Sequence, residues 1–382
     1  MKVLFVNHTV QIGGAEVSLI TLIEGLCALG CHGQELAVAV PSSGPLTKRL
    51  NSLGVEVFHI PGLERFKRTW SPLLLAKFVW GWLVGSRALA LLVRRFNPDI
   101  LHFNSASALL YALGMRRRSG STPRMIWHAR DLVAYGMLCG PLFKCVDSVI
   151  AISETVAEHL SAQGCPGAKL VIIDNPVDAE PFLCADGASV RAEWNVSRNA
   201  LLFGMVGQIV PWKQHDVLIR AAAIAVRQLP ATARFVIVGT DMFGDHQGYA
   251  ARLHRLLDEA ALSTRFIWAG YRTDMANVMA AIDVLVHPTK YEPFGRSVVE
   301  AMASGKAVVV AGSGGVSEFV EHQRTGLVLK SAEPEALAAV MVSVAENVAL
   351  RVRLGKAAQD LVRERFHSIR CAKQVVQLWE RS

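Results

Sequence analysis

The stretch that decides the fold runs from Val284 to Gly305 and reads VLVHPTKYEPFGRSVVEAMASG. Its first residues form a short apolar run that ends at Val286, which predicts a buried strand. A polar loop follows, and the pattern from about Arg296 predicts a helix that stops at Gly305, since glycine commonly ends helices. A strand, a loop and a helix in this order are the building unit of an α/β fold.

The same alternation extends outward in both directions. The first series of predicted strands is Val3–Val6, Leu36–Val40, Val55–Ile60, Ile100–Phe103, Arg124–Trp127, Val149–Ile152 and Leu170–Ile173. The second series is Leu201–Val206, Phe235–Val238, Phe266–Trp268, Val284–Val286, Ala307–Val310 and Leu327–Leu329. Helical patterns separate the runs, so we expect two doubly wound units, each with a parallel sheet covered on both faces. Ligands of such sheets bind at the carboxyl ends of the strands, which places the expected site in a cleft between the two domains.

The two series predict two domains, residues 1–178 and residues 190–365. Asp178 to Asn199 lacks a clean period and is expected to be a hinge and linker. Residues 366–382 form a last helix, which we expect to dock back on the first domain; the alternative is a terminal helix on the second domain. The apolar face of this helix consists of Val375, Val376, Leu378 and Trp379.

Composition sets the class of protein. The chain has 382 residues, of which 52% are hydrophobic and 19% charged, which excludes a disordered protein. The net charge of +8 is modest and spread out, so it favours acidic ligands or a membrane surface over nucleic acid. The 7 cysteines include no C-x-x-C pair, which indicates reduced thiols and a cytoplasmic protein. The start of the chain resembles a buried strand rather than a secretory signal.

Two carboxylates lie in the stretch that opens this section. Glu292 is on the predicted loop, and Glu300 lies two turns into the helix. The backbone N–H groups at the helix start suit an anionic or hydroxyl-rich ligand, and paired carboxylates can accept hydrogen bonds from sugar hydroxyls. The alternative is a surface helix with two solvated glutamates.

The whole segment resembles the E-x7-E signature of the retaining glycosyltransferases of family 4 (group 1), which have the GT-B fold. The resemblance implies that Glu292 holds the donor sugar together with the backbone at Phe294 and Gly295. It also implies that Glu300 holds the ribose hydroxyls of the nucleotide.

A second site segment, Gly207 to Lys213, directly follows the predicted strand Leu201–Val206. Glycine permits close backbone approach and lysine supplies a compact charge, so this loop suits a diphosphate. The resemblance implies that Lys213 and the residue after Gly207 clamp the donor diphosphate, and that the backbone at Gly207 approaches it closely. The family usually has arginine where this chain has Gln208, which can donate to a phosphate oxygen without charge assistance.

Three further landmarks match the family. Gly14 lies in a Gly-Gly loop at the head of the first helix, and Gly314 with Gly315 lies in a second glycine-rich loop; both loops are implied to face the donor. His128 follows the strand Arg124–Trp127 and matches a histidine beside the transferred sugar, although an isolated histidine after a strand is more often structural. There is no G-x-G-x-x-G, which argues against a nicotinamide or flavin enzyme.

These features together predict a glycosyltransferase that moves a hexose from a nucleotide diphosphate sugar to an acceptor hydroxyl in polysaccharide, lipopolysaccharide or glycolipid synthesis. The expected catalytic residues are His128, Glu292 and Lys213, with no metal and no cofactor, because there is no Asp-x-Asp motif. One alternative is a nucleotide-sugar epimerase of the same fold, and another is an impaired sugar-nucleotide binder. The sequence identifies neither the sugar, the base nor the acceptor.

Residues 65–95 contain basic residues interleaved with tryptophan and leucine, and no acidic residue. This composition suits an amphipathic helix in the interface of an anionic membrane, to which residues 116–118, all arginine, would add. The alternative is an ordinary helix that packs on the sheet. The predicted location is therefore cytoplasmic and peripheral to the inner face of the membrane, next to a glycan or lipid-linked acceptor.

Overall fold

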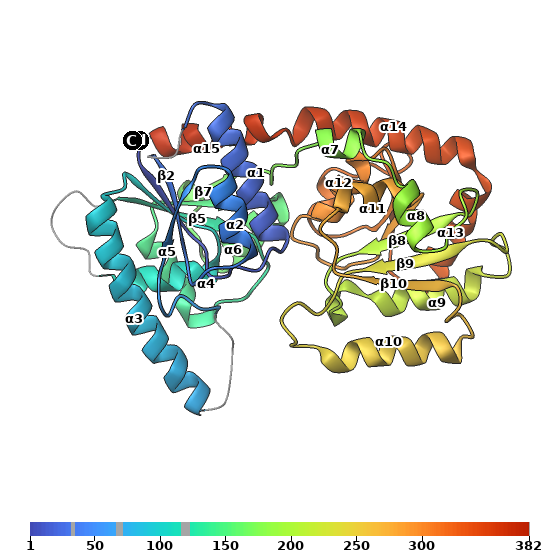
Figure 1. Cartoon of the computed structure of the whole chain (residues 1–382), viewed down its shortest axis with the longest axis horizontal. Coiled ribbons are helices and arrows are strands. Elements are labelled where there is room, and N and C mark those ends of the chain that lie inside the picture. The colour runs from blue at the N-terminus through green and yellow to red at the C-terminus, as the bar shows by residue number, and fades with distance from the viewer. Residues whose placement is uncertain (32–34, 66–71, 116–122, 382) are drawn as a thin grey trace. The chain divides into compact units, whose positions relative to one another are not determined.

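The computed structural model describes residues 1–31, 35–65, 72–115 and 123–381. The chain divides into two compact units. Unit 1 comprises Met1–Pro176 and Ser368–Ser382, and unit 2 comprises Val177–His367 (Figure 1). Each unit is built on one parallel sheet.

Unit 1 has a seven-stranded sheet in the order β3-β2-β1-β4-β5-β6-β7, with all neighbours parallel. The central strands are apolar and buried on both faces, as a sheet covered on both sides requires. The strands are β1 (Val3–Val6), β2 (Leu36–Val40), β3 (Glu56–His59), β4 (Ile100–Phe103), β5 (Arg124–Ala129), β6 (Ser148–Ala151) and β7 (Leu170–Ile172).

The helices of unit 1 connect these strands, and the last helix of the chain joins them. They are α1 (Gly14–Ala28), α2 (Pro45–Ser52), α3 (Pro72–Phe96), α4 (Ala106–Leu109), η1 (Leu110–Gly114), η2 (Gly136–Leu138), α5 (Cys139–Cys145), α6 (Glu154–Ala162), η3 (Gly167–Lys169) and α15 (Ser368–Glu380).

Helix α15 packs along α1 in unit 1. The two helices approach closely because α1 has Gly25 at the crossing, where a Cβ atom would lie 2.7 Å from the carbonyl oxygen of Ser368. Val375, Leu378 and Trp379 are buried in the same hydrophobic cluster as β1 and α1. Helix α15 therefore completes the hydrophobic core formed by β1 and α1.

Unit 2 has a six-stranded parallel sheet in the order β10-β9-β8-β11-β12-β13. Its strands are β8 (Leu202–Val206), β9 (Arg234–Val238), β10 (Phe266–Gly270), β11 (Val284–His287), β12 (Ala307–Ala311) and β13 (Leu327–Leu329). Its helices are α7 (Glu180–Leu183), α8 (Ala188–Glu193), η4 (Pro211–Lys213), α9 (His215–Ala225), α10 (Gln247–Glu259), α11 (Met275–Ala281), α12 (Arg296–Ala303), η5 (Gly315–Glu318), α13 (Pro334–Glu346) and α14 (Val348–Arg365).

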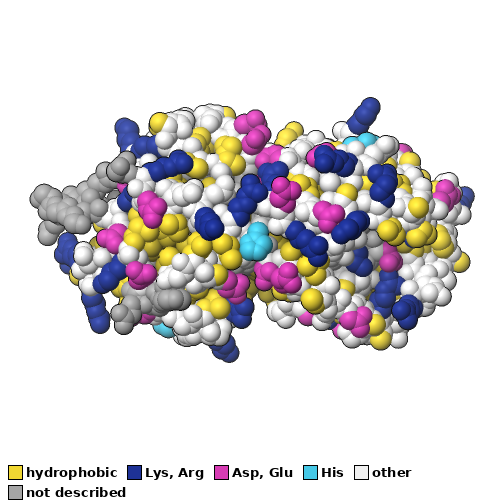
Figure 2. All heavy atoms as spheres, turned by 90° about the horizontal axis from the view of Figure 1, so that it is seen from above, with side chains coloured by type: hydrophobic (Ala, Val, Ile, Leu, Met, Phe, Trp, Pro, Cys, Tyr) yellow, Lys and Arg dark blue, Asp and Glu magenta, His cyan; other side chains and the backbone are white. Residues whose placement is uncertain are grey.

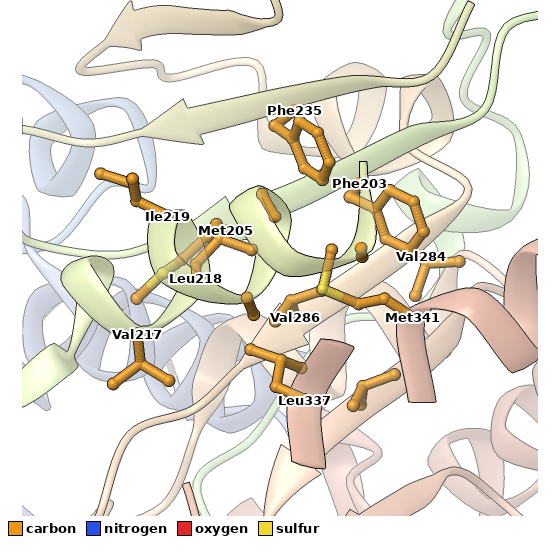
Figure 3. Packing of buried hydrophobic residues seen from close by; sticks show 14 of the residues in the cluster. Phe203, Met205, Val217, Leu218, Ile219, Phe235, Val284, Val286, Leu337 and Met341 are labelled. Carbon is orange, nitrogen blue, oxygen red and sulfur yellow. The ribbon is translucent and has the colours of Figure 1, made fainter. Parts of the chain in front are cut away.

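One face of the unit 2 sheet packs against α9, α10 and α13. Figure 3 shows Phe203 and Met205 from β8 among side chains of α9 and α13, with Met341 near the middle. The rings of Phe203 and Phe235 stack with centroids 5.5 Å apart, and the Phe203 side chain is fully buried. This packed face fixes the ends of β8 and β11, from which the site loops leave.

The segment from Asp178 to Asn199 differs from the expected linker, because it forms α7 and α8 and belongs to unit 2. Arg191 anchors α8 by hydrogen bonds to the Ala281 carbonyl at 2.8 Å and to Asp283 at 2.7 Å. Both helices are too short to show a helical period in the sequence, which explains the difference.

Charged side chains are dispersed over the face of the molecule that Figure 2 shows. Figure 2 shows Lys and Arg scattered over the visible face and interspersed with Asp and Glu. A single basic footprint, as expected of a nucleic-acid-binding protein, is not seen on that face.

Candidate active site

The strand order reverses in the middle of each sheet, and the loops at these two switch points carry most of the predicted site residues. In unit 2, β8 lies between β9 and β11, so the loops after β8 and β11 diverge to opposite faces. Gly207 follows β8, and the segment from Pro288 to Gly295 follows β11. Such a switch point is where open α/β sheets bind ligands.

Lys213 and Glu292 meet at this switch point although they are 79 residues apart in the sequence. The Lys213 Nζ donates to Glu292 Oε2 at 2.5 Å, and Nε2 of His287 is 3.0 Å from the same oxygen. Lys213 also lies over the ring of Trp212, 4.4 Å from its centroid, and that ring is half exposed. The three polar groups form one largely buried cluster, and the Trp212 ring lies against its lysine.

The pKa values of Glu292 and His287 determine the protonation state of this cluster. Burial tends to raise the pKa of Glu292, but the adjacent Lys213 charge and the His287 hydrogen bond outweigh it and lower that pKa to about 2. Burial lowers the pKa of His287, so the imidazole is neutral and its Nε2–H donates to the carboxylate. The cluster therefore holds a carboxylate acceptor and an ammonium donor side by side.

The glycine-rich loop between β12 and η5 packs directly on the Glu292 loop. Gly315 N–H donates to the Glu292 carbonyl at 2.6 Å, and Gly314 pairs with Glu292 as an isolated parallel bridge. Gly314 has φ of +83°, and a Cβ atom there would lie 2.5 Å from the Glu292 backbone nitrogen. Gly295 has φ of +91°, and its Cβ would lie 2.3 Å from Val316. The fold itself therefore requires glycine at these positions.

Phe294 contributes to the site only through its backbone. Its side chain is buried and packs against Phe319 and Phe366, with ring centroids 5.8 Å and 5.6 Å away. This aromatic contact holds the loop that precedes α12. At the start of α12 the N–H groups of Val298 and Val299 donate to the Gly295 carbonyl at 2.9 Å and 3.2 Å. A helix N-terminus favours an anion or a hydroxyl oxygen through its dipole.

Glu300 is buried in α12 and accepts a hydrogen bond from Nε of Arg296 at 2.8 Å, one helical turn earlier. Burial raises the pKa of Glu300, and the Arg296 charge partly offsets that effect. Gln208 is partly exposed, and its side chain makes no hydrogen bond with the described residues. The Gln208 side chain is therefore available to a ligand. Glu300 can bind a ligand only if it gives up the hydrogen bond from Arg296 or keeps it while accepting another.

Unit 1 has its own switch point at β1, which lies between β2 and β4. Asn7 follows β1 and Asn104 follows β4, and the Asn104 amide donates to the Asn7 side-chain oxygen at 2.8 Å. Arg130 donates to Asn104 at 2.9 Å and also to Asn175. Glu16 closes the network by accepting from Asn7 at 3.3 Å. All five residues are buried, so they form a rigid polar floor at the end of the sheet.

His128, the predicted catalytic residue of unit 1, lies beside this network. Its Nδ1 is 3.2 Å from Nε2 of His102 and 3.3 Å from a guanidinium nitrogen of Arg130. Its Nε2 is buried without a hydrogen-bond partner. Burial, followed by the Arg130 charge, lowers the pKa of His128 well below its usual value. The neutral imidazole therefore has one nitrogen whose hydrogen-bonding capacity is unmet inside the protein.

Gly14 begins α1 and is exposed. A Cβ atom at Gly14 would meet nothing within 4 Å, in contrast to Gly314 and Gly295. The backbone of unit 1 therefore does not require glycine there, and the space beside its Cα atom is open.

Comparison with known proteins supplies the family. The model for glycosyl transferases group 1 matches residues 188–361, and the model for Glycosyltransferase Family 4 matches residues 12–181. The chain belongs to glycosyltransferase family 4. The family is the predicted one, and the chain is therefore a glycosyltransferase.

Relatives of this family 4 chain differ in the reactions that their names state. A GDP-mannose-dependent alpha-mannosyltransferase of Mycobacterium tuberculosis is 29% identical over 85% of this chain and 82% of its own length. A D-inositol 3-phosphate glycosyltransferase of Kribbella flavida is 31% identical over 56% of this chain and 52% of its own length.

Solved structures establish the GT-B fold that the sequence predicts. The crystal structure of HepE from Anabaena in complex with UDP-glucose has a TM-score of 0.84 at 24% identity, with 99% of both chains covered. WaaG, a glycosyltransferase involved in lipopolysaccharide biosynthesis, has a TM-score of 0.70 at 14% identity, with 100% of both chains covered.

Two polar groups of this family 4 enzyme escaped the sequence analysis. His287 is the last residue of β11 and contacts Glu292, and His102 on β4 contacts His128. Both histidines interrupt otherwise apolar strands near a switch point, which is the signal that could have identified them. Within the described ranges, no group of three His, Cys, Asp or Glu side chains could hold a metal ion.

Proposed function

We propose that this glycosyltransferase transfers a hexose from a nucleotide diphosphate sugar to an acceptor hydroxyl, with retention of the anomeric configuration. The acceptor belongs to a growing polysaccharide, a lipopolysaccharide or a glycolipid. The observation that carries the proposal is the Lys213–Glu292 pair at the unit 2 switch point, held by a glycine-rich loop on one side and the start of α12 on the other.

The roles in unit 2 follow from the charges. Lys213 binds the donor diphosphate, because an ammonium beside helix and loop N–H groups stabilises a phosphate leaving group. Glu292 accepts hydrogen bonds from the sugar hydroxyls, since the low pKa keeps it ionised. Glu300 binds the ribose hydroxyls. Gly207, Gln208, Gly314 and Gly315 line the phosphates, and the backbone of Phe294 and Gly295 lies beside the sugar.

The proposed roles in unit 1 belong to Gly14 and His128. Gly14 lets a phosphate approach the first turn of α1, where the helix dipole favours an anion. His128 offers its buried Nε2 to a hydroxyl of the transferred sugar, while His102 and Arg130 hold the other side of the ring.

The reaction needs no covalent intermediate. The acceptor hydroxyl attacks from the face that the diphosphate leaves, and the departing phosphate takes up the proton. Lys213 and the backbone N–H groups stabilise the charge that develops on the leaving group. Positioning of both substrates and exclusion of water suppress hydrolysis, the main competing reaction.

Two donors are suggested by the relatives. Two related proteins are named for GDP-mannose, and the structurally similar HepE was solved with UDP-glucose. A cytoplasmic location fits a nucleotide-sugar donor and the 7 cysteines, which form no disulfide with one another in the described part of the chain. The proposed donor is therefore a hexose linked to a uridine or guanosine diphosphate.

The test begins with the full-length chain and thermal unfolding in UDP-glucose, GDP-mannose and ADP-glucose. A rise in melting temperature with one of them identifies the donor. That donor, incubated with a panel of glycan and lipid-linked acceptors, is expected to yield free nucleotide and a product of retained configuration by NMR. Conversion of the nucleotide sugar to an isomer without acceptor would instead indicate an epimerase. Tight binding without turnover on any acceptor would indicate an impaired binder.

A further inference from the structure

Among the residues that the structure describes, those of unit 1 contact helix α3 along one side. On that side Nε1 of Trp82 donates to the Leu110 carbonyl at 2.8 Å, and Leu89 and Leu92 are buried. At the C-terminal end the Phe96 ring packs edge-on against Phe58, with centroids 5.8 Å apart. The N-terminal half of α3 projects beyond the rest of unit 1 (Figure 1). The helix is thus fixed at one end and open at the other.

The opposite side of α3 carries large apolar side chains that contact little protein. We call Leu73, Trp80, Leu83 and Leu91 the outer stripe, because their helical spacing places them on one face. Their exposed fractions are 83%, 71%, 52% and 59%. Single exposed leucines are ordinary, but four large apolar side chains on one helix face, one of them a tryptophan, indicate an interaction surface.

The charges around the outer stripe are all positive. Lys77, Arg87, Arg94 and Arg95 are exposed on α3, and residues 65–95 contain no Asp or Glu. Long basic side chains can extend past apolar neighbours to reach anionic groups while the tryptophan and leucines enter a less polar layer. The partner of this face must therefore be negatively charged at its surface and apolar beneath it.

We propose that the outer stripe binds the surface of an anionic lipid bilayer, with α3 lying along the interface. A second copy of the chain is a poorer occupant, because the same cluster of positive charges would face itself. Residues Leu75–Phe96 are long and apolar enough to cross a membrane by length and composition alone. The contacts of Trp82, Leu89 and Leu92 with unit 1 oppose a crossing, since a span would have to break them. Residues 66–71 and 116–118, which the sequence analysis assigned to the same surface, lie outside the described residues.

The experiment is co-sedimentation of the full-length protein with vesicles. Vesicles of phosphatidylcholine mixed with phosphatidylglycerol are compared with pure phosphatidylcholine at low and high salt. We expect binding that requires the anionic lipid and is lost at high salt. Lys77→Glu with Arg87→Glu should weaken partitioning by a factor on the order of 30 or more, because each basic residue contributes appreciably near an anionic surface. Trp80→Ser with Leu83→Ser should weaken it through the lost apolar contact.

Matched controls separate this face from general charge and hydrophobicity. Arg227→Glu with Arg255→Glu makes the same charge change at exposed positions of unit 2, and Ile224→Ser with Val352→Ser removes exposed apolar groups there. Both controls should bind like the wild type, and thermal unfolding checks that each variant is folded.

Three results would overturn the proposal. The first is equal recovery of the wild type in the supernatant with both vesicle types, which needs no variant. The second is retention on vesicles at high salt and alkaline pH, which indicates a spanning helix. The third is a dimer in light scattering that the α3 variants dissociate, without vesicle binding, which assigns the face to a second copy.

Discussion

Substitution of Lys213 tests whether this residue binds the donor diphosphate. Lys213→Ala removes the charge that would contact the leaving diphosphate, so the transition state should lose about 2–4 kcal/mol of stabilisation. The value of kcat/KM should therefore fall on the order of 30- to 1,000-fold. The variant also leaves Glu292 buried without its cation, and the pKa of that carboxyl should rise. Initial rates with the identified donor measure the effect. Lys356→Ala, at an exposed lysine of α14, serves as control, and a Lys213→Ala variant with wild-type kcat/KM contradicts the assignment.

Substitution of Gly314 by alanine should lower stability, whereas the same substitution at Gly14 should lower turnover without lowering stability. Gly314→Ala places a Cβ against the Glu292 backbone at φ of +83°, so unit 2 should lose about 1–3 kcal/mol or more of unfolding free energy. Gly14→Ala meets open space, so thermal unfolding should stay within about 0.5 kcal/mol of the wild type. Its turnover should nevertheless fall, because the methyl group occupies the proposed phosphate path. Unchanged turnover in a folded Gly14→Ala variant would exclude Gly14 from the donor site.

Gln208 offers a gain of function. The side chain is partly exposed and makes no hydrogen bond with the described residues, so Gln208→Arg should be accommodated. A second cation beside the diphosphate should tighten donor binding several-fold through a charge-assisted hydrogen bond. Titration calorimetry with the donor measures the change, and Gln208→Lys tests whether charge alone suffices. Weaker donor binding by both folded variants would show that Gln208 does not face the phosphates.

At the scale of elements, α15 should control the stability of unit 1. Trp379 is 4% exposed and its ring lies 6.0 Å from Phe5 and 5.9 Å from His102. Trp379→Ala should therefore lower the unfolding free energy of unit 1 by about 3–5 kcal/mol. Urea unfolding followed by hydrogen exchange in β1 measures it, with Val352→Ala on the exposed face of α14 as control. Deletion of residues 367–382 should have a larger effect. A truncated chain with an intact unit 1 would refute the docking role.

Elements with a strong period were predictable and short ones were not. Central strand runs, such as Val3–Val6, could be recognised because a strand buried on both faces is continuously apolar. Helices α7 and α8 were missed because four to six residues carry no period. The loops of the site were found by motif, and the Lys213–Glu292 contact was not predictable because it depends on strand order.

At the scale of the whole molecule, buried histidines should set the acid limit of stability. Burial lowers the pKa of His102 and of His215 to about 3, one in each unit. Below pH 6.5 these histidines are protonated in the unfolded chain but stay neutral in the folded chain. Their contribution to the free energy of unfolding is therefore fully present above pH 6.5 and falls as the pH drops toward 3. Each histidine contributes a slope of about 1.4 kcal/mol per pH unit. Glu292 acts in the same direction at lower pH, between its usual value of 4.5 and about 2.

Urea unfolding at pH 7.5, 6.5, 5.5 and 4.5 checks this expectation. His102→Gln removes one titrating group and should flatten the pH dependence of unit 1, whereas the exposed His246→Gln should leave it unchanged. A stability that is constant from pH 7.5 to 4.5 would mean that the buried histidines accept protons within the folded chain.

Because α15 belongs to unit 1, the ribosome makes the two parts of one core at different times. Phe5 and α1 are made before Val177–His367, and Trp379 is made after it. At roughly 5–20 residues per second, the second-made unit can fold while the first still exposes the apolar side of α1. The apolar side of α1 therefore stays uncovered until α15 has been made, and a product that ends before α15 lacks part of the core of unit 1.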